Sequence, residues 1–224
     1  MLMKRKLDIL YEDKELLIVN KRSNYLTVST DKVKENTLFH EVFTYIKGKN
    51  KNNKIFIVNR LDKDTSGIVV FAKSEKVKIL LQNSWGNVIR RYHAVVVGKV
   101  VKKSDTVKSY LKESKSLVVY SSNDSKNGKL AITSYQVIKE NNNYSLLLID
   151  IKTGRKNQIR VHMNLINHPI VGDKKYGNKR SNYQRMFLHA SYIKLINPIT
   201  KKEIEINSNY PISFDSFFNN NYLG

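Results

Sequence analysis

The sequence predicts an α+β fold, in which a sheet of short strands is accompanied by a few amphipathic helices. Short apolar runs recur at residues 16–19, 68–71 and 144–151, which is typical of buried strands, and the run at 68–71 is rich in β-branched residues. Two other segments place apolar side chains at helical spacing after a residue that favours helix starts. An Asn-Gly pair at residues 127–128 lies between two alternating segments, which is typical of a hairpin.

The N-terminal third predicts two strands and a helix. Residues 7–20 favour two short strands around an acidic turn, and the apolar residues 16–19 indicate a central strand. A helix is predicted to begin after an N-cap at Asn36 and to stop at Gly48. Its apolar face is formed by Phe39, Val42, Phe43 and Ile46.

The middle of the chain predicts a second helix and then mainly strands. Ser74 is the expected N-cap of this helix, whose inward face is formed by Val77, Leu80, Leu81 and Trp85. Strands are expected at residues 95–97, 116–121, 130–138 and 144–151, and the last is apolar enough to be central in a sheet.

The C-terminal third predicts one more helix and a strand pair. Gly154 is expected to end the preceding strand, and Ile159, Met163 and Ile166 share one helical face. This places Arg155 and Arg160 near the start of the helix. Strands are expected at residues 192–196 and 203–206.

The charge of the chain predicts a polyanionic partner. Its 224 residues contain 40 Lys plus Arg and 19 Asp plus Glu, so the net charge is +21 with neutral His. A genome rich in A·T pairs would also inflate Lys and Asn, and this alternative explains part of the excess. The even hydrophobic content favours one catalytic domain over residues 1–224, either compact or divided into two lobes.

The absence of Cys from the sequence excludes disulfides, thiolate catalysis and Cys-ligated zinc. The five His residues are scattered and lack the HExxH spacing, so no metal site is expected. No run of residues is long and apolar enough to suggest a signal peptide or a membrane span. We therefore expect a cytoplasmic protein with no membrane association.

Residues 58–74 place a polar loop directly before a buried strand, an arrangement that often carries chemistry. Asp62 lies two residues after Arg60, a cation that could hold its carboxylate ionised, and Asp64 is the competing acid. A solvated turn is the plain alternative. A calcium loop is excluded because Lys73 stands where the bidentate Glu would be required.

The segment VNRLDKDTSGIVV at residues 58–70 resembles the signature HRLDxxTSG of the RluA-type pseudouridine synthases. Asn59 replaces the histidine of that signature. The resemblance implies a mixed, largely antiparallel central β-sheet flanked by helices and loops. It also implies that Asp62 is the catalytic aspartate, and we expect no separate N-terminal RNA-binding domain of the kind that some relatives have.

Two further segments carry the same resemblance. Residues 91–94 keep the family's pattern of a basic residue, Tyr, any residue and Ala, which implies that Tyr92 lies in the active site. Residues 153–177 resemble TGRxHQ(I/L)RVH…GHPIxGDxxYG, with Asn157 in place of His and Asn167 in place of Gly. By this match Arg160 is the cation that pairs with the catalytic aspartate. The resemblance extends over about residues 7–211.

The resemblance implies an RNA pseudouridine synthase, an isomerase that converts uridine to pseudouridine within structured rRNA or tRNA. No cofactor or metal is expected, and the protein is expected to be a monomer. The residues expected to contact RNA are Arg60, Arg155, Lys174 and Lys175. Arg60 would fill the gap left by a flipped base, although a salt bridge to the neighbouring acids is nearly as good an explanation. Plain solvation is the alternative for the two lysines.

Two other functions are the alternatives to this one. The changes at Asn59 and Asn157 leave open a catalytically degenerate relative that binds RNA during ribosome or RNA maturation. A metal-dependent nuclease would need clustered acids or His, which the sequence lacks. Retention of Asp62, Tyr92 and Arg160 favours the enzyme.

Overall fold

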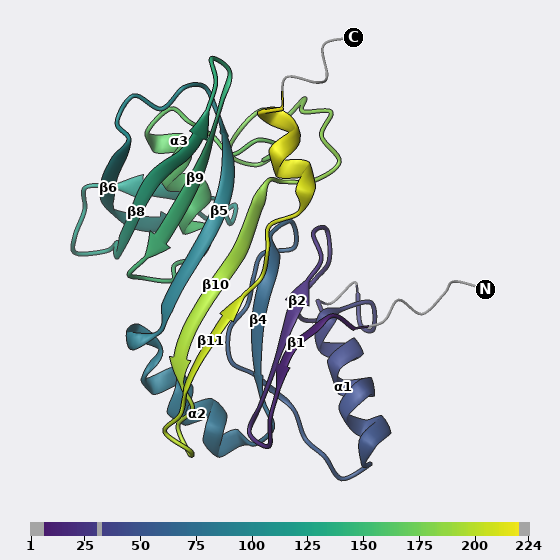
Figure 1. Cartoon of the computed structure of the whole chain (residues 1–224). Coiled ribbons are helices and arrows are strands. Elements are labelled where there is room, and N and C mark those ends of the chain that lie inside the picture. Colours follow the sequence, from purple (N-terminus) through teal and green to yellow (C-terminus); the bar gives the residue numbers. More distant parts are fainter. Residues whose placement is uncertain (1–6, 31–32, 220–224) are drawn as a thin grey trace. The chain divides into compact units, whose positions relative to one another are not determined.

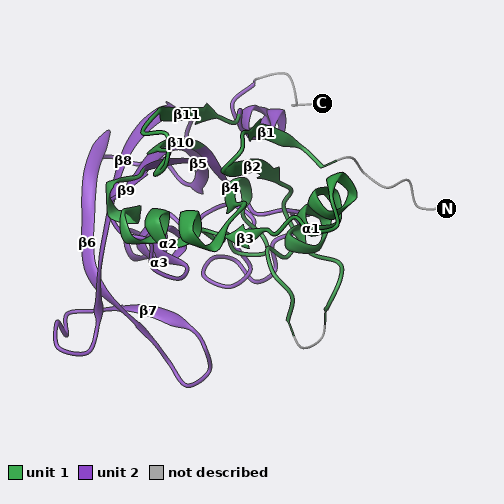
Figure 2. Cartoon of the chain, turned by 90° about the horizontal axis from the view of Figure 1, so that it is seen from below, with its two compact units in different colours: residues 1–88, 192–208 green, residues 89–191, 209–224 purple. Residues whose placement is uncertain are grey.

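The computed structural model describes residues 7–30 and 33–219, and the chain is divided into two compact units (Figures 1 and 2). Unit 1 comprises residues 1–88 and 192–208, and unit 2 comprises residues 89–191 and 209–224. The boundary falls within strand β10 (Leu188–Ile196), so one continuous strand contributes residues to both units.

Unit 1 is built on the antiparallel strands β1, β2 and β4, with β2 in the middle. Leu17 and Val19 of β2 point to the face that α1 covers, whereas Leu16 and Ile18 point to the face that α2 covers. This alternation follows from the two-residue period of a strand, and all four side chains are completely buried. The elements of unit 1 are β1 (Ile9–Glu12), β2 (Leu16–Lys21), α1 (Leu38–Lys49), β3 (Phe56–Ile57), β4 (Ser66–Ala72), α2 (Glu75–Asn83), the 3-10 turn η1 (Trp85–Asn87) and β11 (Glu203–Asn207).

Unit 2 contains the antiparallel strand order β5-β9-β8-β6-β7. Helix α3 packs on one face, where Ile159 and Met163 join a cluster that includes Leu147 and Ile149 of β9. The C-terminal turn η2 packs on the other face through Phe214. The elements of unit 2 are β5 (Ile89–Val97), β6 (Ser104–Glu113), β7 (Val119–Ser122), β8 (Lys129–Glu140), β9 (Tyr144–Ile151), α3 (Gln158–Leu165) and η2 (Ile212–Phe217).

The predicted α+β class with largely antiparallel pairing is confirmed. The apolar runs at residues 16–19, 68–71 and 144–151 lie in β2, β4 and β9, and both β2 and β9 have a neighbouring strand on each side. Ser74 caps α2 as expected, because its side chain accepts a hydrogen bond from the backbone N–H of Val77.

The predicted limits of α1 were wrong by one residue at the start and by two at the end. Thr37, not Asn36, is the N-cap, because Thr37 has the extended backbone of a cap and its hydroxyl accepts from the His40 N–H. The helix also continues through Gly48 to Lys49. Phe43 was expected in the core but is 40% exposed.

Three other predictions on local structure need correction. Leu80 is exposed on α2, and Trp85 lies beyond that helix in η1. The strand expected at residues 116–121 is β7, which starts at Val119 because the chain turns tightly before it, with Leu117 at a φ of 60°. Arg155 precedes α3 and does not lie within its first turn, since the helix begins at Gln158.

Gly172 is a glycine of unit 2 whose surroundings leave no space for a side chain. Its φ is +78°, and a Cβ there would lie 2.0 Å from the backbone oxygen of Arg185 and 2.9 Å from the carbonyl carbon of that residue. Both obstacles are backbone, which cannot rotate away. Gly48, by contrast, lies within α1, and a Cβ there would meet nothing within 4 Å.

We therefore expect Gly172→Ala to lower the free energy of unfolding by at least about 3 kcal/mol, because it combines a steric clash with a left-handed backbone. Gly48→Ala is the matched control and should stabilise by roughly 0.5 kcal/mol through helix propensity. Urea unfolding midpoints of the two variants measure the difference. Equal midpoints would show that the backbone around Arg185 can move to accommodate the added methyl group.

Candidate active site

The loop that carries Asp62 is attached to β4 by two adjacent contacts. The backbone N–H of Val58 donates to the oxygen of Val70 at 3.0 Å, and the side-chain Oδ1 of Asn59 accepts from the Val70 N–H at 2.8 Å. Asn59 thus supplies a side-chain acceptor where the strand pairing ends. The position that carries His in the RluA-type signature is here occupied by a hydrogen-bonding residue with a structural contact.

A second segment, residues 21–27, holds the same loop through its backbone oxygens. The Thr27 hydroxyl donates to the Leu61 oxygen at 2.6 Å, and the Ser23 hydroxyl donates to the Asp64 oxygen at 2.6 Å. Between these contacts, the Tyr25 N–H donates to the Lys63 oxygen at 3.0 Å. The carbonyls on both sides of Asp62 are therefore fixed.

Lys21 adds a buried charge to this support. Its side chain is completely buried, and its ammonium donates to the carbonyl oxygens of Arg22, Tyr25 and Lys63. A buried ammonium needs such acceptors, so the three carbonyls must converge on it. The sequence analysis assigned no role to Lys21, because lysine is usually exposed and one of its acceptors lies 42 residues away.

The polar side chains of the loop differ in exposure. Asp62 and Asp64 are partly buried, whereas Arg60 is exposed. Among the described residues Arg60 forms no ion pair with either acid, so the salt bridge considered for it is absent there. A tight turn follows Asp62, since the Thr65 N–H donates to the Asp62 oxygen at 3.2 Å.

The turn that precedes α3 is organised by Gln158. This side chain is buried, and its amide donates to the oxygen of Ile132 and to the hydroxyl of Thr133. Its Oε1 accepts from the Thr153 hydroxyl and from the Arg155 N–H. Gln158 therefore ties the start of α3 to β8, which fixes the helix that carries Arg160.

Arg160 lies in the first turn of α3 and is 5% exposed. Its Nε and Nη2 donate to the two carboxylate oxygens of Asp173, each at 2.8 Å, a bidentate pairing. Burial acts to raise the pKa of Asp173, but the hydrogen bonds and charge of Arg160 and the N–H groups of Tyr176 and Lys175 outweigh it, so this pKa lies below its usual value. Sequence reasoning saw Asp173 only as a turn residue.

Tyr92 lies in β5 and is partly buried, and it packs against the cluster that contains Ile159 and Met163 of α3. The structure thus places Tyr92 on the face of the unit 2 sheet that α3 covers. Arg90, two residues earlier, is buried. Burial lowers the pKa of Arg90, and the charges of Tyr92 and Asp150 oppose that shift.

His162 is the remaining titratable group buried on α3. Its Nδ1 is 2.8 Å from the Thr133 hydroxyl and its Nε2 is 3.1 Å from the Ser109 hydroxyl. Burial lowers the pKa of His162 to about 4, so the ring is neutral at pH 7. With both nitrogens occupied by hydroxyls, His162 joins α3 to β6 and β8.

Three residues expected to contact RNA lie at the surface of unit 2. Arg155 is exposed, and its Nε donates to the Leu130 oxygen at 2.9 Å. Lys174 and Lys175 are also exposed and follow Asp173 in the same loop. Asp62 and Arg60 belong to unit 1, whereas Tyr92, Arg155, Arg160, Lys174 and Lys175 belong to unit 2.

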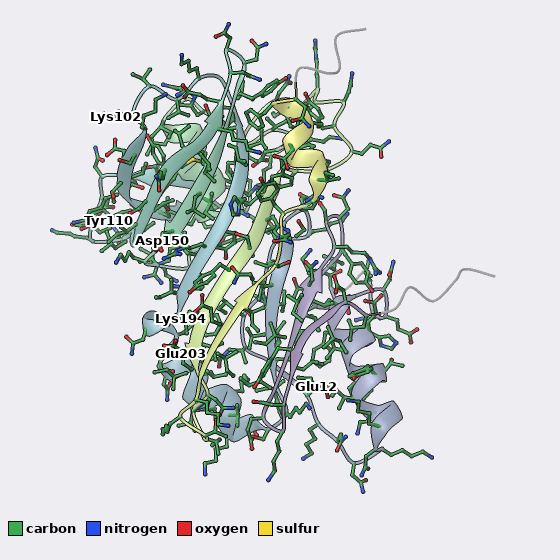
Figure 3. The ribbon with its side chains drawn as sticks, viewed as in Figure 1. Glu12, Lys102, Tyr110, Asp150, Lys194 and Glu203 are labelled. Carbon is green, nitrogen blue, oxygen red and sulfur yellow. The ribbon has the colours of Figure 1, made fainter. Side chains whose placement is uncertain are left out.

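Several acids of the surface pair with nearby lysines, among them Glu203 with Lys194, which are both labelled in Figure 3. Glu12 accepts from Lys49 and Lys73, which together hold its pKa near 2 against the effect of burial. Lys194 pairs with Glu203 at 2.8 Å across β10 and β11. Because nearby lysines neutralise many of these acids, the excess of 21 positive charges belongs to cations at the surface.

Residues 7–30 and 33–219 contain neither a cluster of metal ligands nor a helix that could span a membrane. No three His, Asp or Glu side chains gather there as ligands for a metal ion. None of the helices in this part of the chain is long and apolar enough to cross a membrane.

Comparison with known proteins identifies the family. Residues 15–165 match the RNA pseudouridylate synthase family. Ribosomal large subunit pseudouridine synthase D of Buchnera aphidicola is 37% identical over 225 residues, which cover 92% of this chain and 69% of that protein. Ribosomal large subunit pseudouridine synthase C of Rickettsia prowazekii is 39% identical over 215 residues, with the same coverage.

Solved structures show the same fold at lower sequence identity. The structure of human RNA pseudouridylate synthase domain containing 4 superposes with a TM-score of 0.78 at 22% identity, covering 92% of this chain and 90% of that one. The family match spans Asp62, Tyr92 and Arg160 in this chain. The chain belongs to the RNA pseudouridylate synthase family.

Proposed function

We propose that this RNA pseudouridine synthase acts on uridine in large-subunit ribosomal RNA, with Asp62 as its essential carboxylate. The observation that carries this proposal is the support of the Asp62 loop, whose carbonyls are fixed by Thr27, Lys21 and Ser23. A backbone held in this way limits the positions that the Asp62 carboxylate can take, which favours catalysis. The substrate follows from the printed names of the relatives in Buchnera and Rickettsia.

The reaction is an isomerisation, so its atoms balance without a second substrate. The bond between C1′ of the ribose and N1 of uracil breaks, and a bond between C1′ and C5 forms. The proton on C5 leaves and N1 gains one. The enzyme must supply an ionised carboxylate near the sugar, a cation that orients it, and a group that assists removal of the C5 proton.

Asp62, Arg160 and Tyr92 are the residues that we assign to these three tasks. Asp62 acts on the sugar or the base in its unprotonated form, either as a nucleophile or as a base. Arg160 provides the positive charge, held rigid by Asp173. The phenol of Tyr92, fixed in β5, is assigned to the proton at C5.

RNA binding is assigned to the cations at the surface. Arg60 is exposed in the catalytic loop, so it can enter the gap that a flipped uridine leaves. Arg155, Lys174 and Lys175 lie at the surface near the two ends of the segment that carries Arg160, and we assign them to phosphate contacts. No metal or cofactor enters these assignments.

The degenerate RNA-binding relative is the weaker alternative. It rested on the replacement of two histidines by Asn59 and Asn157, but both asparagines make hydrogen bonds through Oδ1. These contacts are consistent with structural roles at both positions. The residues that carry the chemistry are retained.

We expect Asp62→Ala to reduce turnover at least about a hundredfold, because the reaction requires an ionised carboxylate and we assign that task to Asp62. Asp64→Ala is the matched control in the same loop and should remain within tenfold of wild type. Tritium release from RNA labelled at uridine C5 measures turnover, and circular dichroism verifies the fold. Loss of activity in Asp64→Ala alone would exchange the roles of the two acids.

Arg160→Met should destabilise unit 2 by about 3 kcal/mol, because it leaves the Asp173 carboxylate buried without its partner. Adding Asp173→Asn removes that charge, so we expect the double variant to be more stable than the single variant but still inactive. Urea unfolding measures the coupling.

Arg91→Met is the control, because its ion pair with Asp150 is partly exposed. We expect its free energy of unfolding to change by no more than about 0.5 kcal/mol. Additive effects of the two changes at Arg160 and Asp173 would contradict the pairing.

Binding to a uridine-containing stem-loop should weaken linearly in log affinity against log salt, with a slope of about −0.7 to −0.9 per phosphate contact. The double reversal Lys174→Glu/Lys175→Glu should lower affinity and reduce this slope. The matched control is Lys51→Glu/Lys54→Glu, which changes the net charge equally in an exposed loop of unit 1. Equal losses in both double variants would mean that net charge alone, and not local contact, governs binding.

A further inference from the structure

We propose that Tyr176 is a positioning residue for Arg160, holding the guanidinium and the start of α3 in place together. The inference rests on the proposed function in one respect, namely that Arg160 serves the reaction. The geometry itself lies entirely within unit 2. Nothing in the sequence analysis assigned a role to this tyrosine.

The ring of Tyr176 lies beside the buried ion pair. The guanidinium carbon of Arg160 is 5.1 Å from the ring centroid, within the range at which a cation is attracted to an aromatic face. The backbone N–H of Tyr176 donates to Oδ1 of Asp173 at 3.0 Å. This is the oxygen that also accepts from Nη2 of Arg160. One residue therefore contacts both members of the pair.

The hydroxyl of Tyr176 extends this contact to two other elements. It donates to Oδ1 of Asn157 at 3.0 Å and accepts from the backbone N–H of Val119 at 3.1 Å. Asn157 is the residue immediately before α3, and its backbone oxygen accepts from the Val161 N–H in the first turn. The hydroxyl thus bridges the start of α3 and the first residue of β7.

Both the backbone conformation and the side chain of Asn157 suit this position. Its φ is 54°, in the left-handed region that asparagine adopts more readily than most residues. Its side chain is buried and offers the oxygen that the tyrosine hydroxyl requires. The Asn that replaces the family's histidine is therefore the anchor through which Tyr176 reaches the turn before Arg160.

A purely structural role for Tyr176 would predict a different result. The ring also packs at the edge of the cluster formed by Leu111, Val119, Ala131 and Val161. If packing were its whole contribution, changes at Tyr176 would reduce stability and leave the turnover of the folded enzyme unchanged. If Tyr176 positions Arg160, kcat falls while KM for RNA remains constant.

Two variants test the hydroxyl and the ring of Tyr176 separately. Tyr176→Phe keeps the ring beside Arg160 and removes both hydroxyl contacts, and we expect kcat to fall roughly tenfold with KM within twofold. Tyr176→Leu also removes the ring, and a loss of about a hundredfold in kcat is expected. Tyr45→Phe is the control, since it removes a partly buried tyrosine hydroxyl bond, to Glu12 in unit 1, and should leave kcat unchanged.

Two measurements are made on each variant. The first gives kcat and KM with an unmodified large-subunit rRNA transcript that is tritiated at uridine C5. The second is hydrogen exchange of the Arg160 Nε–H, followed by NMR. That resonance is assigned by its loss in Arg160→Lys. We expect exchange at least about tenfold faster in Tyr176→Leu, since the guanidinium is less firmly held. Unchanged exchange in this variant overturns the inference, as does an unchanged kcat. If wild type does not turn over the transcript, the proposed substrate fails, and the exchange rates alone decide the role of Tyr176.

Discussion

A buried guanidinium must be matched by acceptors, and this requirement determines the arrangement around Arg160. The two oxygens of Asp173 meet Nε and Nη2 of Arg160 in parallel, so the side chain cannot rotate without breaking both contacts. Such a pair is costly to bury and strongly destabilising to break, so the loop that contains Asp173 must keep its shape. The backbone of Gly172, which accepts no Cβ, lies directly before it.

A parallel constraint operates in unit 1. There the buried ammonium of Lys21 must be satisfied by carbonyls, and it takes them from its own strand end and from the loop that carries Asp62. In unit 1 the buried cation supports the loop of a residue assigned to catalysis, whereas in unit 2 the buried cation is itself that residue. The two cations differ in their partners, since Arg160 meets a carboxylate and Lys21 meets neutral oxygens.

The sequence was sufficient to predict these strands, because residues 16–19, 68–71 and 144–151 form apolar runs of the length that is typical of buried strands. Motif resemblance supplied the candidate catalytic residues. It did not reveal Lys21 or Tyr176, whose partners at Lys63 and Asn157 are distant in sequence. The helix start at Thr37 was missed for a local reason, since Asn36 and Thr37 are both good caps and only backbone geometry distinguishes them.

Asn59 and Asn157 affect how the stability of the protein depends on pH. Asn59 and Asn157 each use Oδ1 as an acceptor, and neither side chain changes its charge at any pH that a folded protein meets. A histidine in either place would carry its own titration near neutrality, and its proton would contribute to the balance between folded and unfolded chains. With amides in both places, the contact from the loop of Asp62 to β4 and the contact at the start of α3 take up no proton as the surroundings become acidic.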